Sequence, residues 1–535
     1  MSLARNIGLG LDRIISAVAP KLALQREAAR LQNRQLVRAS GAWDGAATSR
    51  RWSDRSIMPG SANSDLDRDD LDRLRSRSRD RWRNDGLAHG AIGSMAEGIT
   101  GTGLRPLLRL DHETLGISRD EAKALQRQAA QIWREWSATA DAAERVHMDQ
   151  LQALVVSSAL MSGDVFVRPL MVTSQTQPSR FELRLDIIES DRCDSPNGID
   201  RPGEVQSGVV LGTRGEPTHY WISREHPGDH YGARTFDRVP RVDGAGRPSI
   251  LHVYDVERPG QSRGRPLLSP VLDAFKDLDD YVEAELIRSQ VAACFAAFVK
   301  RTDPYGAALA ATASGGQAST QREMEIVPGG VHFLASNEDV TFGNPSSPNA
   351  AFDGFMRTAR QMICAPLGIP YEIAARDLRG MNYSNARAAF LMAWQTFGRR
   401  QRWLVNCLLQ PVWQMLLEEA WLKGVFAARD FSQRQALWSN TIWIAPGKGW
   451  IDPLKEVQAE ALRLKEGLTT RQQIVARYDG ADWETEIAPQ LVEEEALLAQ
   501  LRAARGVEPP AKEADAPQNP QPQIDPAEEP EEATV

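Results

Sequence analysis

The chain has 535 residues, of which 42% are hydrophobic and 25% are charged. These are the proportions of an ordinary globular protein that can bury a sizeable core. The net charge of −8 argues against a general nucleic-acid binder. No run of about 18 apolar residues occurs, so we expect no membrane span. The four cysteines are widely spaced, at Cys193, Cys294, Cys364 and Cys407, so we expect neither a disulfide scaffold nor a zinc site.

Residues 1–85 are predicted to form an arm that is partly flexible. Their last part, residues 65–84, is dense in charge. Arginine stands at every second position there, at Arg73, Arg75, Arg77, Arg79, Arg81 and Arg83. One interpretation is a phosphate-binding patch. The other is a solvated helix whose arginines pair with Asp69, Asp70, Asp72 and Asp80. The interleaving of acids at three and four residues favours the helix.

Residues 86–260 have the pattern of an α+β domain. We expect helices over 86–97, 118–136 and 148–161, the second with a capping box of Ser118 and Glu121. The glycine-rich stretch 98–106 predicts a helix end, because it lacks the spacing of a dinucleotide-binding motif. Alternation and turn signals predict a mostly antiparallel sheet. Its strands are Val165–Met171, Phe181–Ile187, Val205–Leu211, His219–Ser223 and Ile250–Tyr254.

One group of residues has the composition of a metal site. It consists of His219, His226, Asp229, His230 and His252. A metal would require these side chains to converge on one ion at about 2 Å. The HPGDHYG stretch has the pattern of a turn between strands instead. We therefore predict ordinary loop histidines, no metal and no cofactor.

Residues 265–422 predict two helical arms, at 265–301 and 350–368, separated by an insert at 302–348. A loop at 371–384 follows. Ser384 is the expected N-cap of a long helix over 385–423, which Pro411 should kink. On the first arm Asp273, Asp277 and Asp280 share one helical face.

The remaining segments complete the organisation of the chain. The insert contains short strand candidates that cannot fold alone. Residues 424–495 add short helices, and the acidic, proline-rich residues 507–535 are expected to be disordered. No P-loop, GxSxG or HExxH motif occurs, so the sequence predicts a protein that is not an enzyme.

Five stretches in order resemble the lambda-type family of phage portal proteins. They read RDRWRNDGLAHGAIGSMAEGITGTGLRP (79–106), HPGDHYGARTFDRVPR (226–241), ILHVYDVERPGQSRGRP (250–266), PLGIPYEIAARDLRGMNYSNARAAF (366–390) and WIDPLKEVQAEALRLKEGLTTRQQIVARYDGADWE (450–484). The resemblance covers about residues 70–495. Asp85 and Asn385 depart from the family pattern, which has Asn and Ser there, and both are conservative in turn chemistry.

The resemblance implies a multidomain portal fold. Residues 86–260, with mixed helices and antiparallel sheet, would be the wing, and the helix 385–423 would belong to it. The arms 265–301 and 350–368 would be the stem. Residues 302–348 would be a small α/β clip, 371–384 the tunnel loop, and 424–495 the helical crown region.

The family also implies a ring, usually of twelve copies, at one vertex of a phage head. Such a ring is a channel through which double-stranded DNA is packaged and ejected without sequence specificity. Its expected partners are the terminase large subunit, the major capsid protein and head-completion or adaptor proteins, with no membrane. It would be assembled in the bacterial cytoplasm and reside in the virion. The alternatives are a minor head or scaffold protein without a pore, and a phage hydrolase with an unfamiliar site.

Two sets of residues are the expected sites. The DNA-channel set is Asp273, Asp277, Asp280, Arg376, Arg379, Asn382 and Tyr383. The motor-docking set in the clip is Glu323, Glu325, His332, Glu338 and Asp339. Two alternatives stay open: the arginines could pair with Asp377 or Glu372 instead of guiding DNA, and the stem acids could lie on a solvated outer face.

Overall fold

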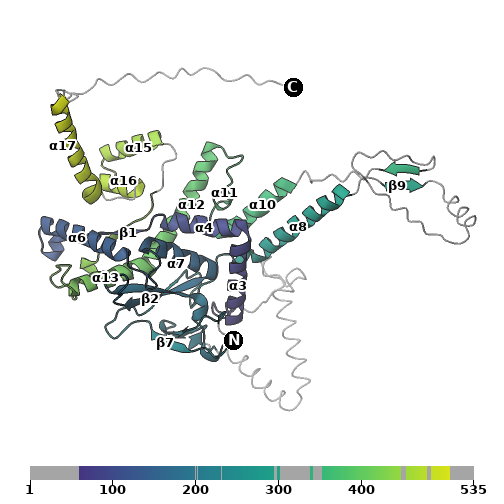
Figure 1. The fold of residues 1–535 in the computed structure, drawn as a ribbon, viewed down its shortest axis with the longest axis horizontal. Coiled ribbons are helices and arrows are strands. Elements are labelled where there is room, and N and C mark those ends of the chain that lie inside the picture. Colours follow the sequence, from purple (N-terminus) through teal and green to yellow (C-terminus); the bar gives the residue numbers. More distant parts are fainter. Residues whose placement is uncertain are drawn as a thin grey trace, which may run out of the picture. The chain divides into compact units, whose positions relative to one another are not determined.

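The computed structural model describes residues 60–198, 200–201, 203–229, 232–294, 298–301, 338–341, 352–447, 453–478 and 483–505. The chain divides into a small unit, residues 1–66 and 258–260, and a large unit made of the remainder. The large unit contains every element described below (Figure 1). Among the described residues, no helix is both long enough and apolar enough to cross a membrane.

The first half of the large unit is helix followed by sheet. Its helices are α3 (Arg68–Asn84), α4 (Gly86–Thr100), α5 (His112–Leu115), α6 (Arg119–Ser137) and α7 (Met148–Ser162). Its strands are β1 (Arg105–Leu108), β2 (Asp164–Met171), β3 (Leu183–Glu189), β4 (Val205–Gln206), β5 (Val209–Leu211), β6 (Pro217–Ser223), β7 (Phe236–Pro240) and β8 (Leu251–Tyr254). Short 3-10 turns, Ser190–Arg192 and Pro196–Gly198, follow β3.

The second half is mainly helical. A 3-10 turn, Ser269–Val271, leads into α8 (Leu272–Cys294), and β9 (Phe298–Arg301) pairs with β10 (Glu338–Thr341). The next elements are α10 (Phe352–Cys364), the 3-10 turn Ala365–Leu367, α11 (Tyr371–Ala374), α12 (Tyr383–Leu404), a π-helical turn Val405–Leu409 and α13 (Gln410–Leu422). The last are α14 (Gln435–Trp438), β11 (Thr441–Ile444), α15 (Pro453–Lys465), α16 (Arg471–Tyr478), a π-helical turn Trp483–Ile487 and α17 (Ala488–Arg505).

The strands form antiparallel sheets, which confirms the predicted α+β class. Strands β3, β2 and β8 make one sheet, and β4, β5, β6 and β7 make another. The expected single sheet was therefore wrong. Sequence analysis also missed β7, whose residues are half-buried or exposed and show no clear alternation. The predicted strand 205–211 is two strands, because Ser207 and Gly208 turn the chain with positive φ angles of 45° and 85°.

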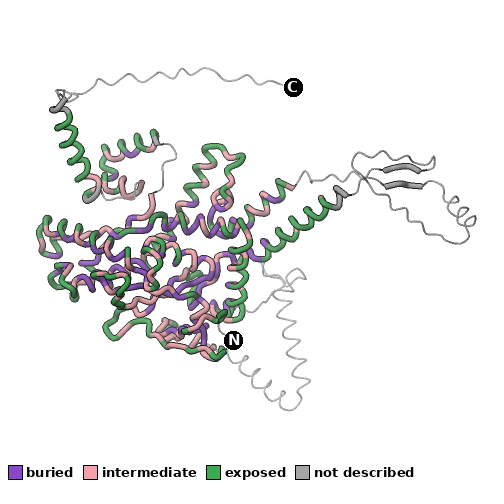
Figure 2. Tube along the Cα trace, viewed as in Figure 1, coloured by how far each residue is buried: buried purple, intermediate pink, exposed green. Residues whose placement is uncertain are grey.

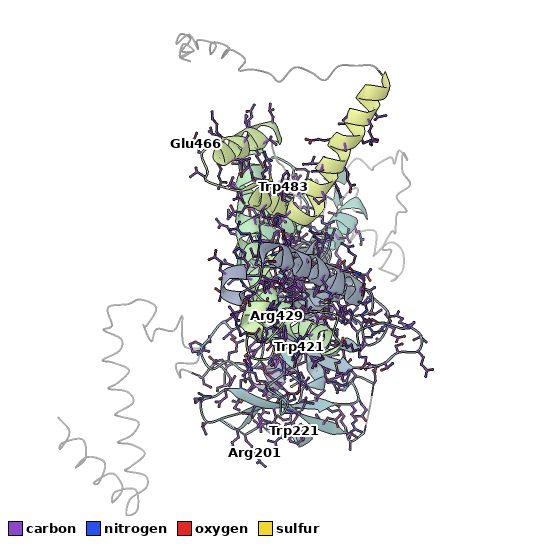
Figure 3. The ribbon with its side chains drawn as sticks, turned by 90° about the vertical axis from the view of Figure 1, so that its left-hand side faces the viewer. Arg201, Trp221, Trp421, Arg429, Glu466 and Trp483 are labelled. Atoms are coloured by element: carbon purple, nitrogen blue, oxygen red, sulfur yellow. The ribbon has the colours of Figure 1, made fainter. Side chains whose placement is uncertain are left out.

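The main core lies between the helices and the three-stranded sheet, as the burial colours show (Figure 2). Helix α7 packs against β2 and β8 of this sheet, and helix α13 packs against β3. Trp136, Trp413 and Trp438 are among the largest fully buried side chains. Trp421 on α13, labelled in Figure 3, stacks on Phe431 with ring centroids 5.5 Å apart. A second cluster contains Phe166 of β2 and Tyr220 of β6, so it joins the two sheets, and β2 has apolar packing on both of its faces.

A close backbone approach joins α7 to the chain that leads into α8. At Gly264 a Cβ atom would lie 1.9 Å from the carbonyl oxygen of Gly163, and Gly163 itself has a φ of +94°. Only glycine fits such a contact and such a backbone angle. The start of the first predicted arm is therefore fixed to the core by two glycines.

The capping predictions had mixed outcomes. The Ser118 side chain accepts a hydrogen bond from the Glu121 amide at 3.1 Å, which confirms Ser118 as the N-cap of the predicted capping box. Gly101 ends α4, as expected. Gly368 ends the second arm, also as expected, and has a left-handed conformation. The N-cap of α12 is Asn382, which accepts from the Asn385 amide at 2.8 Å. The choice of Ser384 was wrong, because an Asn side chain two residues earlier makes the same bond.

Several predicted boundaries also change. The arm 265–301 is helical only over Leu272–Cys294, and its last residues form β9 because they pair with β10. The segment 371–384 contains α11. The long helix 385–423 is interrupted by the π-helical turn Val405–Leu409, just before Pro411. Proline lacks an N–H and its ring clashes with the carbonyl one turn earlier, so the α-helical hydrogen bonding cannot pass through it.

Candidate functional site

The three acids predicted to line a channel lie on helix α8. Asp273, Asp277 and Asp280 are all exposed. Asp280 pairs with Lys276 at 3.4 Å, whereas no described cation contacts Asp273 or Asp277. The helix therefore presents negative charge that is not neutralised within the described chain.

Helix α8 packs along helix α10 through aromatic side chains. The Tyr281 ring lies 4.6 Å from the Phe355 ring and 6.1 Å from the Phe352 ring, measured between centroids. At its first turns α8 is anchored in the core by Val271, Leu272 and Phe275, which are buried. These contacts place the two predicted arms beside each other.

The two arginines of segment 371–384 are both in ion pairs. Arg379 pairs with Asp377 at 2.8 Å, one of the two alternatives considered. Its hydrogen bonds hold the pKa of the Asp377 carboxyl well below the usual range. Arg376 pairs instead with Glu97 of α4 at 2.8 Å, a partner that the sequence did not indicate because it lies 279 residues away. The Arg376–Glu97 pair is exposed on both sides and is therefore weak. In the other pair the Arg379 guanidinium is exposed, whereas Asp377 is 17% exposed.

The other residues of the two predicted sets have different positions. Asn382 caps α12, and Tyr383 in its first turn is 50% exposed. Glu338 and Asp339 lie on β10, in register with Arg301 and Lys300 of β9. Glu323, Glu325 and His332 lie outside the described residues. The structure therefore places two of the five clip residues and all seven channel residues.

Sequence analysis missed a buried charge network at the end of β2. The Asp164 carboxylate is fully buried and accepts hydrogen bonds from Arg263 Nε at 2.6 Å, Arg75 Nη2 at 3.1 Å and the Gly264 amide at 3.1 Å. His252 Nε2 lies 3.1 Å from the same carboxylate. The network connects α3, β2, β8 and the segment before α8.

The pKa values in this network follow from burial opposed by pairing. Burial by itself would raise the pKa of the Asp164 carboxyl, but Arg263 and Arg75 hold it well below the usual range. Burial lowers the pKa of His252, and its hydrogen bond to Asp164 only partly opposes that effect. The aspartate is therefore an anion that balances two buried guanidinium groups.

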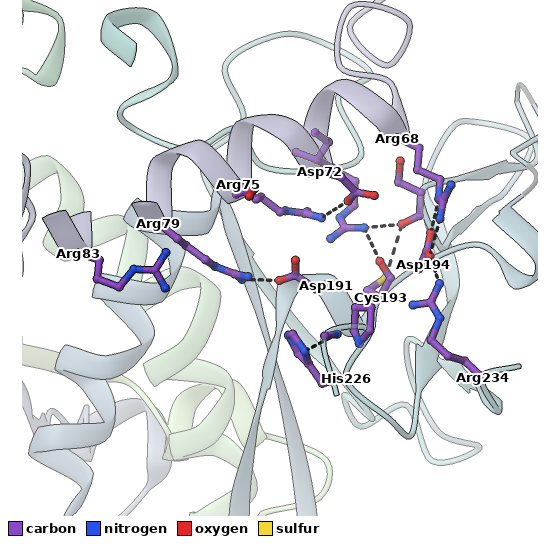
Figure 4. A pocket seen from close by; sticks show the side chains of 16 residues that line it. Arg68, Asp72, Arg75, Arg79, Arg83, Asp191, Cys193, Asp194, His226 and Arg234 are labelled. Carbon is purple, nitrogen blue, oxygen red and sulfur yellow. Dashed lines mark hydrogen bonds and ion pairs between the residues drawn. The ribbon is translucent and has the colours of Figure 1, made fainter. Parts of the chain in front are cut away.

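Beside this network is a polar cavity of about 470 Å³, shown in Figure 4. Arg68 and Arg234 both bind Asp194 there, and Arg79 of α3 pairs with Asp191. The interpretation of residues 65–84 as a solvated helix with local ion pairs was right only in part. Arg73 and Arg83 do pair locally with Asp70 and Asp80. However, Arg68, Arg75 and Arg79 bind distant acids and fasten α3 to the core, so this part of the predicted arm is a structural helix.

The histidines that were considered as metal ligands have different surroundings, as far as they lie within the described residues. His252 is buried against Asp164, and His219 lies on β6. His226 is 2.9 Å from Glu189. These two residues and Asp191 offer ligand atoms within 4.8 Å of one another, but Asp191 already pairs with Arg79. His230 lies outside the described residues.

The family model for phage portal proteins of the lambda family matches residues 48–401. The chain belongs to the lambda family of phage portal proteins. It is 27% identical to Portal protein B of Escherichia phage lambda over 465 residues, which cover 82% of this chain and 85% of that protein. It is 26% identical to the portal protein of Escherichia phage N15, with the same coverage of each chain.

Solved structures give a further likeness. A chain in a structure titled "Virion of native gene transfer agent (GTA) particle" is 16% identical, with a TM-score of 0.37, over 82% of this portal chain and 97% of the other. A chain in "Neck of native GTA particle computed with C12 symmetry" is 13% identical, with a TM-score of 0.38, over 77% and 94%.

Proposed function

We propose that this chain is the subunit of a portal ring at one vertex of a phage head, and that the ring is a conduit for double-stranded DNA. The observation that carries the proposal is the lambda-family match over residues 48–401. It is supported by the 85% coverage of lambda Portal protein B, which leaves little of that relative unmatched.

We further propose the functional parts of the subunit. The wing comprises residues 86–260 with α12 and α13, and α3 extends it because its arginines are fastened to the same core. The stem comprises α8 and α10. The clip is the insert 302–348, which follows β9 and contains β10, and a pair of strands such as β9 and β10 needs neighbours to be stable. The segment 371–384 is the tunnel loop, and α15, α16 and α17 belong to the crown.

The exposed acids of α8 support the conduit proposal physically. A lumen rich in lysine or arginine would release counterions at each phosphate and hold the duplex tightly. Asp273 and Asp277 would instead repel phosphate over a Debye length of about 8 Å. The Arg376 and Arg379 side chains stay exposed in their ion pairs, so DNA phosphates compete with Glu97 and Asp377 for these two cations.

We propose that the ring contacts the major capsid protein around the wing. The clip would dock the terminase large subunit during packaging and head-completion proteins afterwards. Glu338 and Asp339 on β10 are candidates for that docking, together with Glu323, Glu325 and His332. The ring would be assembled in the host cytoplasm and remain in the virion, with no enzymatic step of its own.

Electron microscopy of the purified full-length chain tests this proposal. End-on views are expected to show closed rings, usually of twelve copies, whose central hole admits B-DNA of about 20 Å diameter. Closed particles without such a hole would favour a scaffold protein. Monomers alone at high concentration would refute the portal assignment.

Replacing one lumen acid tests the electrostatic part separately. Asp277→Lys is expected to leave ring assembly intact and to slow DNA packaging severalfold, because the added cations attract phosphate. Packaging by purified heads and terminase measures the effect, and Asp120→Lys on the exposed start of α6 is the matched control. Equal packaging rates for both variants would refute the acidic-lumen idea while leaving the ring intact.

A further inference from the structure

The first half of helix α12 exposes apolar side chains, which an isolated subunit does not explain. Residues Phe390, Leu391 and Met392 are exposed, with Met392 63% accessible to solvent. Exposed apolar side chains thus surround about one turn of the helix, and a helix that is apolar all round is normally covered on all sides. Only deeper in the helix, from Ala393 and Phe397 onward, does the core bury one face.

A groove lies beside this part of the helix, and of the three exposed residues Met392 lines it. It has a volume of about 920 Å³ and lies between α10, α11 and α12. Met392 and Ala388 of α12 line it opposite Cys364 and Ala365. The groove is therefore a largely apolar surface that the described chain does not cover.

The two ends of the groove carry arginines. Arg357 lies near the start of α12, where its Nη2 donates to the Arg379 carbonyl at 3.2 Å. Arg399 lies at the other end, one turn beyond Thr396, whose hydroxyl bonds the Gly368 carbonyl at 2.7 Å. Arg399 is exposed, and no described acid pairs with it. Glu372 also lines the groove, which leaves one excess positive charge.

Helix α8 carries an apolar surface whose nearby charge is negative, opposite to that of the groove. Its apolar stripe starts as Val271 and Phe275 in the core and continues to Val282 and Leu286, which are 38% and 57% exposed. Glu283 lies beside this exposed end of the stripe, with no described cation in contact. By helical geometry this stripe points away from the face that carries Asp273, Asp277 and Asp280, so it can be covered while those acids stay exposed.

We propose that the exposed stripe of α8 in one copy docks into the α10–α12 groove of the next copy. The groove and the stripe are both apolar, and the groove is cationic where α8 is acidic. They are different surfaces of the same subunit, so the contact is head-to-tail and generates a ring when the rotation closes. This inference rests on the ring proposed above and names the surfaces that build it.

The first test introduces a charge into each apolar surface of the full-length chain. Leu286→Glu and Met392→Glu should each lower the yield of rings at least about tenfold, because a buried unpaired carboxylate opposes every contact in the ring. Mass photometry and negative-stain microscopy measure the yield. Leu154→Glu, at a 47% exposed position on α7, is the matched control and should form rings at the wild-type yield.

The second test reverses charges. Arg399→Glu should reduce ring yield, and adding Glu283→Arg should restore part of it, which a mere loss of folding would not allow. An unchanged circular-dichroism melting curve confirms that each variant subunit folds. If Leu286→Glu and Met392→Glu both form rings normally, the docking surfaces are wrong and the portal ring stands. If the wild-type chain forms no rings, the proposed function itself fails and this inference fails with it.

Discussion

Replacing Asp164 by asparagine should strongly destabilise the large unit. The carboxylate is 0% exposed and lies within 3.1 Å of nitrogen atoms of both Arg75 and Arg263. Asparagine keeps the volume and one acceptor oxygen but removes the charge. Two buried guanidinium groups would then lack their anion, and removing one partner of a buried ion pair costs about 3–5 kcal/mol.

The size of the effect can be converted into a melting temperature. For a cooperative unit of several hundred residues, a loss of 3–5 kcal/mol lowers the midpoint by about 4–6 °C. The assay is thermal unfolding of the full-length chain at pH 7, followed by circular dichroism. At this pH the effect is fully developed, because an aspartate whose folded pKa is depressed stabilises the fold above its unfolded pKa of about 3.9.

Asp186→Asn provides the matched control. Asp186 pairs with Arg168 at 2.8 Å, but both side chains are more than a quarter exposed. Loss of such a pair costs only about 0–1 kcal/mol. If Asp164→Asn melts no lower than Asp186→Asn, the claim that Asp164 neutralises two buried arginines is wrong.

Three further predictions concern stability. Gly264→Ala should destabilise by about 1–3 kcal/mol in urea unfolding, because its Cβ would meet the Gly163 carbonyl oxygen, whereas Gly244→Ala meets no atom within 4 Å and should be neutral. The pKa of His252 is lowered in the folded chain. Its contribution to the free energy of unfolding is therefore present above about pH 6.5 and is lost as the pH falls toward the folded pKa. His252→Gln should therefore flatten the dependence of melting temperature on pH between 7 and 5; an unchanged slope would refute this. Ser118→Ala should cost about 1 kcal/mol by loss of the helix cap, and no change in the urea midpoint would contradict the capping role.

Local patterns in the sequence predicted much of the secondary structure. Helix α7 and strand β2 begin and end within a residue of the predicted positions, because buried side chains recur there with helical or strand periodicity. The stop at Gly368 and the cap at Ser118 were equally local, since each involves atoms within a few residues. The five family stretches added the portal identity, because their order along the chain is itself sequence information.

The tertiary structure decided which charges meet. Arg75 and Asp164 are 89 residues apart, Arg263 and Asp164 are 99 apart, and Arg376 and Glu97 are 279 apart. Acids close to Arg75 in the sequence made a solvated helix the better prediction for α3, yet this arginine is 2% exposed. A charge pattern specifies neither burial nor a distant partner, because both depend on which surfaces pack together. The same holds for the exposed apolar surfaces of α8 and α12, because the sequence pattern of an apolar stripe does not specify which surface packs against it.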